Sequence, residues 1–335
     1  MRQFSYSRPD TLDTACHTPD HTRYLAGGTN LIDLMKSDVE RPEHVVDLSA
    51  LSMRQIEEHP DGGLRLGALA TNADTAAHPL VTERYPLLAS AILAGASPQI
   101  RNKATNGGNL NQRTRCHYFY DPNMACNKRS PGTGCSAKGG RNRIMAILGT
   151  SDSCIATFPS DMCVALAALN AAVNLKGPEG ERSVPLRDYH RLPEDTPWQD
   201  NILRAGEIVT SIDLPPLGFS SHHTYLKIRD RLSFAFAIVS VAAGLQIENN
   251  TIRKACIAMG GVGTKPWCVP EAEALLEEKT PSISLFRDAA ECLLQGAVTD
   301  RDNAAKLKLA PRVIIRALSQ AAAGTPQSQT QKTIF

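Results

Sequence analysis

The sequence predicts a globular protein of mixed helices and strands, divided into two or three domains. The chain has 335 residues, enough for more than one hydrophobic core. Its composition, 42% hydrophobic and 21% charged, is ordinary for a folded protein. Short stretches with strand character alternate with apolar helical stretches along the chain, and the run Pro215-Pro216-Leu217-Gly218 interrupts both patterns. We therefore expect a domain boundary near residue 218.

The first unit is expected over residues 1–55. Phe4 and Tyr6 alternate with polar residues as in a short strand, a helix can begin within 11–18, and 44–48 reads as another strand. Between them, a strand ending in Gly27-Gly28 leads directly into an apolar helix at 31–36. Free N–H groups at such a turn suit an anion, although a tight strand-to-helix turn explains the same pattern.

The second unit is expected over residues 56–218. Strands are predicted at 63–68, 172–176 and 208–214, and apolar helices at 86–96 and 162–171. The third unit, 219–323, begins with strands at 224–229, 237–247 and 251–259, which helices at 270–278, 284–295 and 303–323 follow. The polar tail, 324–335, is predicted to be disordered.

Residues 101–161 hold two kinds of chemistry side by side. The first is Thr105-Asn106-Gly107-Gly108-Asn109, in which adjacent glycines let backbone N–H groups approach a ligand closely. The second is a set of four cysteines among many glycines and prolines, namely Cys116, Cys126, Cys135 and Cys154. Such a composition makes no hydrophobic core of its own, so something else must order it.

The cysteine spacing, C-x9-C-x8-C-x18-C, narrows the choice of ligand. Structural zinc sites use pairs of cysteines two to four residues apart, and no such pair exists here. Wide spacing suits a [4Fe–4S] cluster held by one long loop, since four thiolates are its usual ligands. On spacing alone, a cluster, a zinc site and a loop of free thiols all stay open.

Charge and hydropathy exclude several classes of function. The net charge of +2 gives no reason to expect nucleic acid or an anionic membrane as partner. No apolar run approaches the roughly 20 residues that span a bilayer. The N-terminus has no export signal of its own, so we expect a cytoplasmic protein, or a periplasmic one exported with a partner that carries a signal.

Several motifs together resemble one protein family. They are Ala26-Gly27-Gly28-Thr29-Asn30-Leu31, Ala104-Thr105-Asn106-Gly107-Gly108-Asn109, Pro159-Ser160-Asp161-Met162, Lys227-Ile228-Arg229-Asp230-Arg231, Gly260-Gly261-Val262, Lys265-Pro266-Trp267 and the insert at 126–135. In this order they resemble the FAD-binding, medium subunit of the xanthine dehydrogenase/aldehyde oxidase family of molybdenum hydroxylases. The likeness is greatest to the subgroup, as in bacterial three-subunit aldehyde oxidoreductase, whose flavin subunit carries an extra [4Fe–4S] cluster.

The resemblance implies an α+β fold. Its first two domains would form a two-subdomain FAD-binding fold like that of vanillyl-alcohol oxidase. A C-terminal domain with a three-stranded antiparallel sheet and a helical bundle would follow. The insert at about 113–154 would project from the second subdomain.

The resemblance also implies the ligands of two cofactors. FAD would contact residues 26–34 at its pyrophosphate, Thr105, Gly108 and Asn109 on the other side, and Asp161 at the ribityl chain, with Val209 and Lys227 flanking the flavin. The first of these segments comprises Ala26, Gly27, Gly28, Thr29, Asn30, Leu31, Ile32, Asp33 and Leu34. The [4Fe–4S] cluster would be bound by Cys116, Cys126, Cys135 and Cys154.

By the same resemblance, the chain is an electron-transfer subunit without catalytic residues of its own. A large partner subunit with a molybdenum cofactor would oxidise an aldehyde, xanthine or another heterocycle. A small partner subunit with [2Fe–2S] clusters would pass the electrons to FAD here, and an external acceptor would receive them. Two alternatives are a self-contained flavin oxidoreductase of the same fold and a zinc-stapled interaction module.

Overall fold

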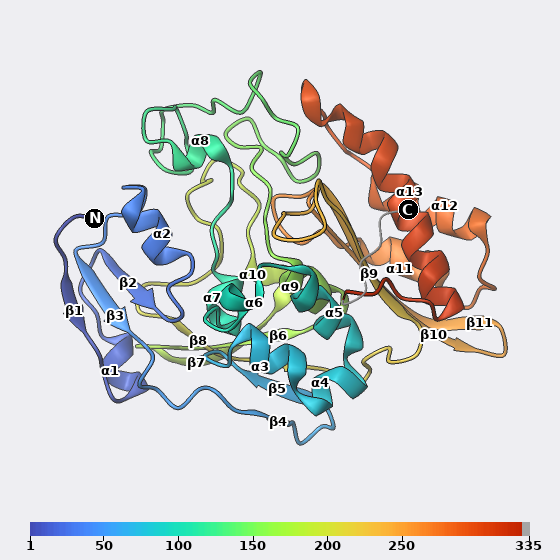
Figure 1. Cartoon of the computed structure of the whole chain (residues 1–335), viewed down its shortest axis with the longest axis horizontal. Helices are drawn as coiled ribbons and strands as arrows, with labels where there is room; N and C mark the ends of the chain where they lie inside the picture. The colour runs from blue at the N-terminus through green and yellow to red at the C-terminus, as the bar shows by residue number, and fades with distance from the viewer. Residues whose placement is uncertain (330–335) are drawn as a thin grey trace.

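The computed structural model describes residues 1–329. Three sheets lie along its long axis, with the N-terminal unit at one end and the C-terminal unit at the other (Figure 1). The cysteine-rich segment forms a long loop beside them, and its short helix α8 (His117–Tyr120) lies at the top of Figure 1. None of the helices in residues 1–329 is long and apolar enough to cross a membrane.

The N-terminal unit is a small parallel sheet in the order β1-β3-β2. Its strands are β1 (Ser5–Ser7), β2 (Thr22–Leu25) and β3 (His44–Asp47). Helices α1 (Leu12–Cys16) and α2 (Leu31–Lys36) provide the crossovers that parallel pairing requires. The Thr11 side chain caps α1 by accepting a hydrogen bond from Thr14 N.

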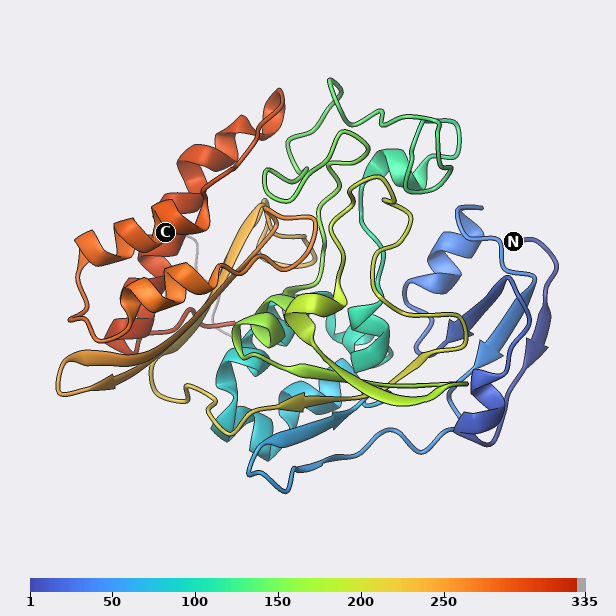
Figure 2. The same ribbon diagram turned by 180° about the vertical axis from the view of Figure 1, so that it is seen from behind.

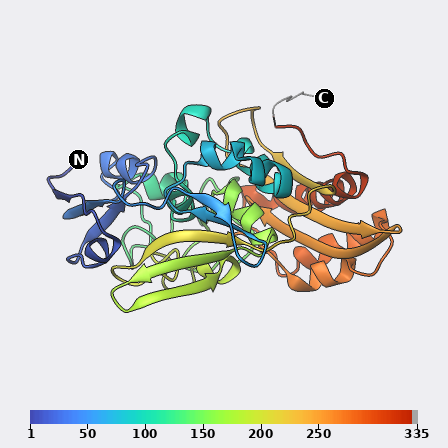
Figure 3. The same ribbon diagram turned by 90° about the horizontal axis from the view of Figure 1, so that it is seen from below.

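The middle unit is a five-stranded antiparallel sheet in the order β4-β5-β8-β6-β7, seen at the bottom of Figure 3. Its strands are β4 (Ile56–Glu58), β5 (Leu64–Gly67), β6 (Ala172–Gly177), β7 (Gly180–Pro185) and β8 (Ile208–Leu214). Its helices are α3 (Asn72–Ala77), α4 (Pro79–Arg84), α5 (Pro86–Ala94), α6 (Pro98–Arg101), α7 (Asn106–Leu110), α9 (Asp161–Ala168) and α10 (Leu186–Tyr189). Helices α5 and α9 are apolar all round because both are buried.

The C-terminal unit is an antiparallel sheet in the order β11-β10-β9 with helices on its outer face (Figure 2). Its elements are β9 (His223–Ile228), β10 (Val239–Glu248), β11 (Thr251–Gly260), α11 (Pro270–Leu276), α12 (Ile283–Leu293), a 3-10 turn η1 (Asp302–Ala304) and α13 (Ala305–Ala323). Alternate residues of β10 belong to two different hydrophobic cores. Val239 and Val241 face α13, whereas Ala242 packs with α5 and α9. The sheet therefore joins the C-terminal unit to the middle one.

The predicted fold class is confirmed, including the three-stranded antiparallel sheet near the C-terminus. The strand β7 was not predicted, since its sequence, GERSVP, carries little apolar signal. Within the tail predicted to be disordered, Gln327 and Gln329 are hydrogen-bonded to β9 through Lys227 N and Tyr225 O. The remainder of that predicted tail, 330–335, lies outside the described residues.

Candidate functional site

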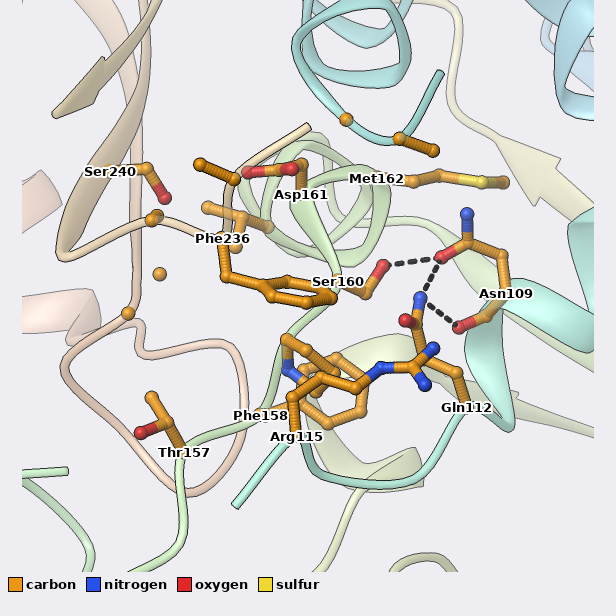
Figure 4. Close-up of a pocket in the computed structure, with 18 of the residues that line it drawn as sticks. Asn109, Gln112, Arg115, Thr157, Phe158, Ser160, Asp161, Met162, Phe236 and Ser240 are labelled. Carbon is orange, nitrogen blue, oxygen red and sulfur yellow. Dashed lines mark hydrogen bonds between the residues drawn. The ribbon is translucent and has the colours of Figure 1, made fainter. Parts of the chain in front are cut away.

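A cavity of about 780 Å³ opens where the three units and the cysteine loop meet. Segments far apart in the sequence line it: the turn before α2, the start of α9, strand β9 and the loop before β10. Figure 4 shows side chains from the start of α9, from the segment after α7 and from the loop before β10 gathered around the cavity. A cavity of this size accommodates a large cofactor.

The two glycine motifs of the sequence lie against each other at one side of this cavity. A Cβ on Gly27 would lie 1.8 Å from the carbonyl oxygen of Lys103, so only glycine permits this approach. Gly28 has a φ of +74°, which turns the chain into α2. Within residues 1–329, the N–H groups of Gly27, Gly28 and Thr29 donate to no protein acceptor, so this turn can present them to a ligand.

The second glycine motif behaves differently from the expectation. It is the helix α7, capped by Thr105, whose hydroxyl accepts a hydrogen bond from Gly108 N at 3.2 Å. Gly107 N donates to Ala68 O at 2.8 Å. These N–H groups are therefore already satisfied within the protein, and the glycines instead let α7 pack closely on the end of β5.

Asn109, at the end of that motif, organises one wall of the cavity. Its Oδ1 accepts hydrogen bonds from Ser160 Oγ at 2.6 Å and from Gln112 Nε2 at 2.7 Å, both drawn in Figure 4. Its Nδ2 donates to Asn72 Oδ1 at 2.7 Å. All four side chains line the cavity. They form a pre-organised polar surface suited to a ligand with many oxygen and nitrogen atoms.

Asp161 begins α9 and forms a buried ion pair at another wall. Its Oδ2 accepts a hydrogen bond from Lys227 Nζ at 2.7 Å, and its Oδ1 accepts one from Tyr225 OH at 2.6 Å. Burial, and then the neighbouring carboxylate, raise the pKa of Tyr225 well above its usual value. Both carboxylate oxygens keep lone pairs for a further donor, such as a hydroxyl group of a ligand.

The structure brings together part of the expected FAD-binding set. The members that line the cavity are Thr29, Asn30, Asp33, Gly108, Asn109, Asp161 and Lys227. The members that do not line it are Ala26, Gly27, Gly28, Leu31, Ile32, Leu34, Thr105 and Val209. Val209 is buried in the core beneath Gly107, and Leu34 packs beside the cysteines. Gly27 and Gly28 directly precede Thr29, which does line it.

Several cavity residues were not predicted as ligands. Arg115 lies with its guanidinium 5.5 Å from the ring centre of Phe236, and both project into the cavity in Figure 4. Arg101 also lines it, at the C-terminus of α6. No sequence pattern indicated Arg101, Arg115 or Phe236 as ligands, because each is a single residue outside the glycine motifs.

Asn30 bears one unused donor at this site. Its Oδ1 accepts a hydrogen bond from Arg113 N at 2.8 Å, whereas its buried Nδ2 has no partner in the described part of the chain. A buried donor without a partner is costly, and a ligand in the cavity would satisfy it.

The four cysteines of the insert line one small, separate pocket of about 10 Å³. Two sulfur atoms lie near backbone N–H groups: Ala156 N donates to Cys154 Sγ at 3.4 Å, and Cys116 faces the N–H groups of Phe119 and Tyr118. Burial raises the pKa of Cys116 to about 12 and that of Cys154 to about 11. Nowhere in residues 1–329 do three potential ligands converge closely enough to hold a metal ion as they stand.

Hydrogen bonds and ion pairs hold the insert in place. At its base, Thr114 Oγ1 donates to Thr157 O at 2.9 Å. Asp200 pairs with both Lys128 and Arg113, and these cations outweigh burial and lower its pKa. The charge of Lys128 is thus balanced by a carboxylate. Cys116 is the one residue that lines both the thiol pocket and the large cavity described for residues 1–329.

Sequence matches assign this fold and its cavity to a known family of flavoproteins. Residues 2–217 match the family described as the FAD binding domain in molybdopterin dehydrogenase, and residues 223–321 match the CO dehydrogenase flavoprotein C-terminal domain. The chain therefore belongs to the family of FAD-binding subunits of molybdenum hydroxylases, and it is a subunit of an oxidoreductase.

Among its relatives, the chain is 43% identical to the aldehyde oxidoreductase FAD-binding subunit PaoB of Escherichia coli K12, covering 96% of this chain and 99% of that one. It is 28% identical to the glyceraldehyde dehydrogenase medium chain of Sulfolobus acidocaldarius, covering 86% of each. Solved structures of carbon monoxide dehydrogenase from Hydrogenophaga pseudoflava and quinoline 2-oxidoreductase from Pseudomonas putida 86 share the fold. The carbon monoxide dehydrogenase chain has a TM-score of 0.75 at 22% identity, covering 96% of this chain and 98% of its own. The quinoline 2-oxidoreductase chain has a TM-score of 0.73 at 23% identity, covering 97% of this chain and 98% of its own.

Proposed function

We propose that FAD occupies the 780 Å³ cavity of this chain. The unpartnered N–H group of Thr29, which lines the cavity, would donate to the pyrophosphate, and those of Gly27 and Gly28 lie directly before it in the same turn. Asn30 Nδ2 donates to the same cofactor, and Asp161 accepts from its ribityl hydroxyls. The carrying observation is the unsatisfied Asn30 donor beside an unused row of N–H groups at the edge of the cavity.

The role we propose is electron transfer within a larger enzyme that oxidises an aldehyde. A bound flavin can exchange one or two electrons, which links a one-electron donor to an external acceptor. The full-length likeness to a relative described as the FAD-binding subunit of an aldehyde oxidoreductase supports this role. Partner subunits with [2Fe–2S] clusters and a molybdenum cofactor would supply the electrons. The protein residues hold and orient the flavin.

We further propose that the four insert cysteines bind a [4Fe–4S] cluster. The donor set is suitable: four thiols line one pocket, and nearby N–H groups stabilise charge on sulfur. A pocket of about 10 Å³ holds roughly one water molecule, so the loop must widen on loading. Metal coordination would also deprotonate Cys116 and Cys154 despite their raised pKa values.

The division into domains follows the same proposal. Residues 1–55 and 56–218 form the two FAD-binding subdomains, the insert at about 113–154 carries the cluster, and 219–323 form the C-terminal domain. The three sheets support these boundaries, since each sheet falls within one of the three ranges.

Anaerobic purification of the chain with its co-expressed neighbours tests both sites. We expect one FAD and four irons per chain, with the iron lost and the flavin kept in Cys126→Ser. The matched control is Cys292→Ser, on α12, which should keep both.

Other outcomes would contradict particular parts of this proposal. Flavin without iron would reject the cluster, and zinc in place of iron would favour a zinc-stapled loop. Substrate turnover by the isolated chain would favour a self-contained flavin oxidoreductase.

A further inference from the structure

Lys306 is a buried cation that the proposed function does not use. It lies at the second position of α13 with 1% of its surface exposed. Its Nζ donates to three backbone carbonyls: Met145 O at 2.7 Å, Ile144 O at 3.1 Å and Gly261 O at 2.5 Å. A lysine this deeply buried is rare unless a carboxylate pairs with it.

The surroundings of Lys306 leave its charge unbalanced. No carboxylate in residues 1–329 forms an ion pair with it, whereas the other buried lysine beside the cavity, Lys227, is paired with Asp161. The positive charge of Arg143, whose own partner is Asp230, acts on Lys306 in the same direction as burial. Burial, with this added repulsion, lowers the pKa of Lys306 to about 7. Well below that pH it carries a positive charge.

The three carbonyl partners connect this charge to the cofactor cavity. Ile144, Met145 and Gly261 all line the cavity, and they come from two separate segments. Ile144 and Met145 belong to the cysteine insert, whereas Gly261 follows β11 with a φ of +73°. Lys306 therefore lies one residue behind the cavity wall and fixes two segments of that wall together.

We propose that Lys306 is a positioning residue that raises the reduction potential of the bound flavin. Uptake of two electrons and one proton adds one negative charge to a flavin. A fixed positive charge behind the wall stabilises that added charge more than it stabilises the oxidised form. In a site that is partly shielded from water, this attraction is screened far less than at the surface. The inference rests on FAD occupying the cavity.

The test compares the flavin potential and flavin affinity of full-length variants at pH 6, where Lys306 is charged. Lys306→Met removes the charge at similar length, and Lys306→Gln keeps a hydrogen-bond donor without the charge. We expect Lys306→Met and Lys306→Gln each to weaken the preference for reduced over oxidised flavin about tenfold. This corresponds to a fall of about 30 mV in the reduction potential of a two-electron couple. Lys306→Arg should largely preserve the potential, because it keeps the charge.

Lys308→Met is the matched control, since Lys308 is exposed on the same helix and its substitution removes the same charge. The reduction potential of the flavin in this variant should not change. If the Lys306 variants weaken the binding of oxidised and reduced flavin equally and leave the potential unchanged, Lys306 is only a structural tie and the inference is wrong. If the wild-type chain contains no flavin at all, the proposed function fails first, which the flavin content shows directly.

Discussion

Lys227 Nζ lies 2.7 Å from Asp161 Oδ2, and this buried pair joins β9 to the start of α9 at the cavity wall. Removing one partner leaves an uncompensated charge inside the protein. We expect Lys227→Met or Asp161→Asn to destabilise the chain by about 3–5 kcal/mol. The double variant should be clearly less destabilised than the sum of the two. Urea unfolding of the four proteins measures this, and strict additivity would show that the pair is not coupled.

The approach of Gly27 to Lys103 predicts a steric effect on the flavin site. In Gly27→Ala the new Cβ meets a backbone oxygen 1.8 Å away, so the turn has to move. We expect a loss of bound flavin at ordinary concentrations and destabilisation of about 1–3 kcal/mol. Gly296→Ala is the control for adding a methyl group where nothing lies within 4 Å of it, and this variant should keep its flavin. Normal flavin content in Gly27→Ala would contradict the close packing of the two segments.

The unused donor of Asn30 predicts a more selective effect. Asn30→Asp keeps an oxygen that can accept from Arg113 N but replaces the Nδ2 donor with an acidic oxygen. We expect about tenfold weaker flavin binding, from one lost hydrogen bond and repulsion by the pyrophosphate. Fluorescence titration of the flavin-free chain measures the affinity. Unchanged affinity would mean that Nδ2 faces no cofactor atom.

His190 predicts a loss of stability in acid. Its ring is buried against Phe158, and Nε2 forms a hydrogen bond with Leu110 O at 2.9 Å. Burial lowers the pKa of His190 to about 4. The unfolded chain binds this proton near pH 6.5, before the folded chain does. The unfolding free energy is therefore highest, as far as His190 is concerned, above pH 6.5. It decreases as the pH falls from 6.5 toward 4, because the unfolded chain binds the proton and the folded chain does not.

We expect the unfolding free energy of the wild type, relative to His190→Gln, to fall by about 1.4 kcal/mol per pH unit across this window. Carboxylates that titrate in the same range affect both proteins, so the difference between them isolates His190. Parallel stability curves between pH 6.5 and 4 would show that His190 is accessible to protons in the folded state.

Local patterns in the sequence predicted what depends on local geometry. The turn at Gly27-Gly28, the apolar helix predicted at 162–171 and the paired strands β10 and β11 are each encoded within a few residues. The ion pair between Asp161 and Lys227 joins residues 66 positions apart, and no local pattern specifies such a pairing. The role of Gly107 was misread for a related reason: its N–H is used by Ala68 O, a partner that only the tertiary fold supplies. The burial of Lys306 was not predicted, because a lysine in an amphipathic helix ordinarily faces water.

The hydrogen bond from Thr114 to Thr157 at the base of the cysteine loop has a topological consequence. Because no sheet strand lies between these two residues, a change in the length of the loop alters neither the order of any sheet nor the path of any strand. The entropy of closing such a loop grows only slowly with its length. The outer part of the loop can therefore vary in length at little cost, whereas Ile144, Met145 and Ile147 are fastened to the cavity wall and to the C-terminal sheet.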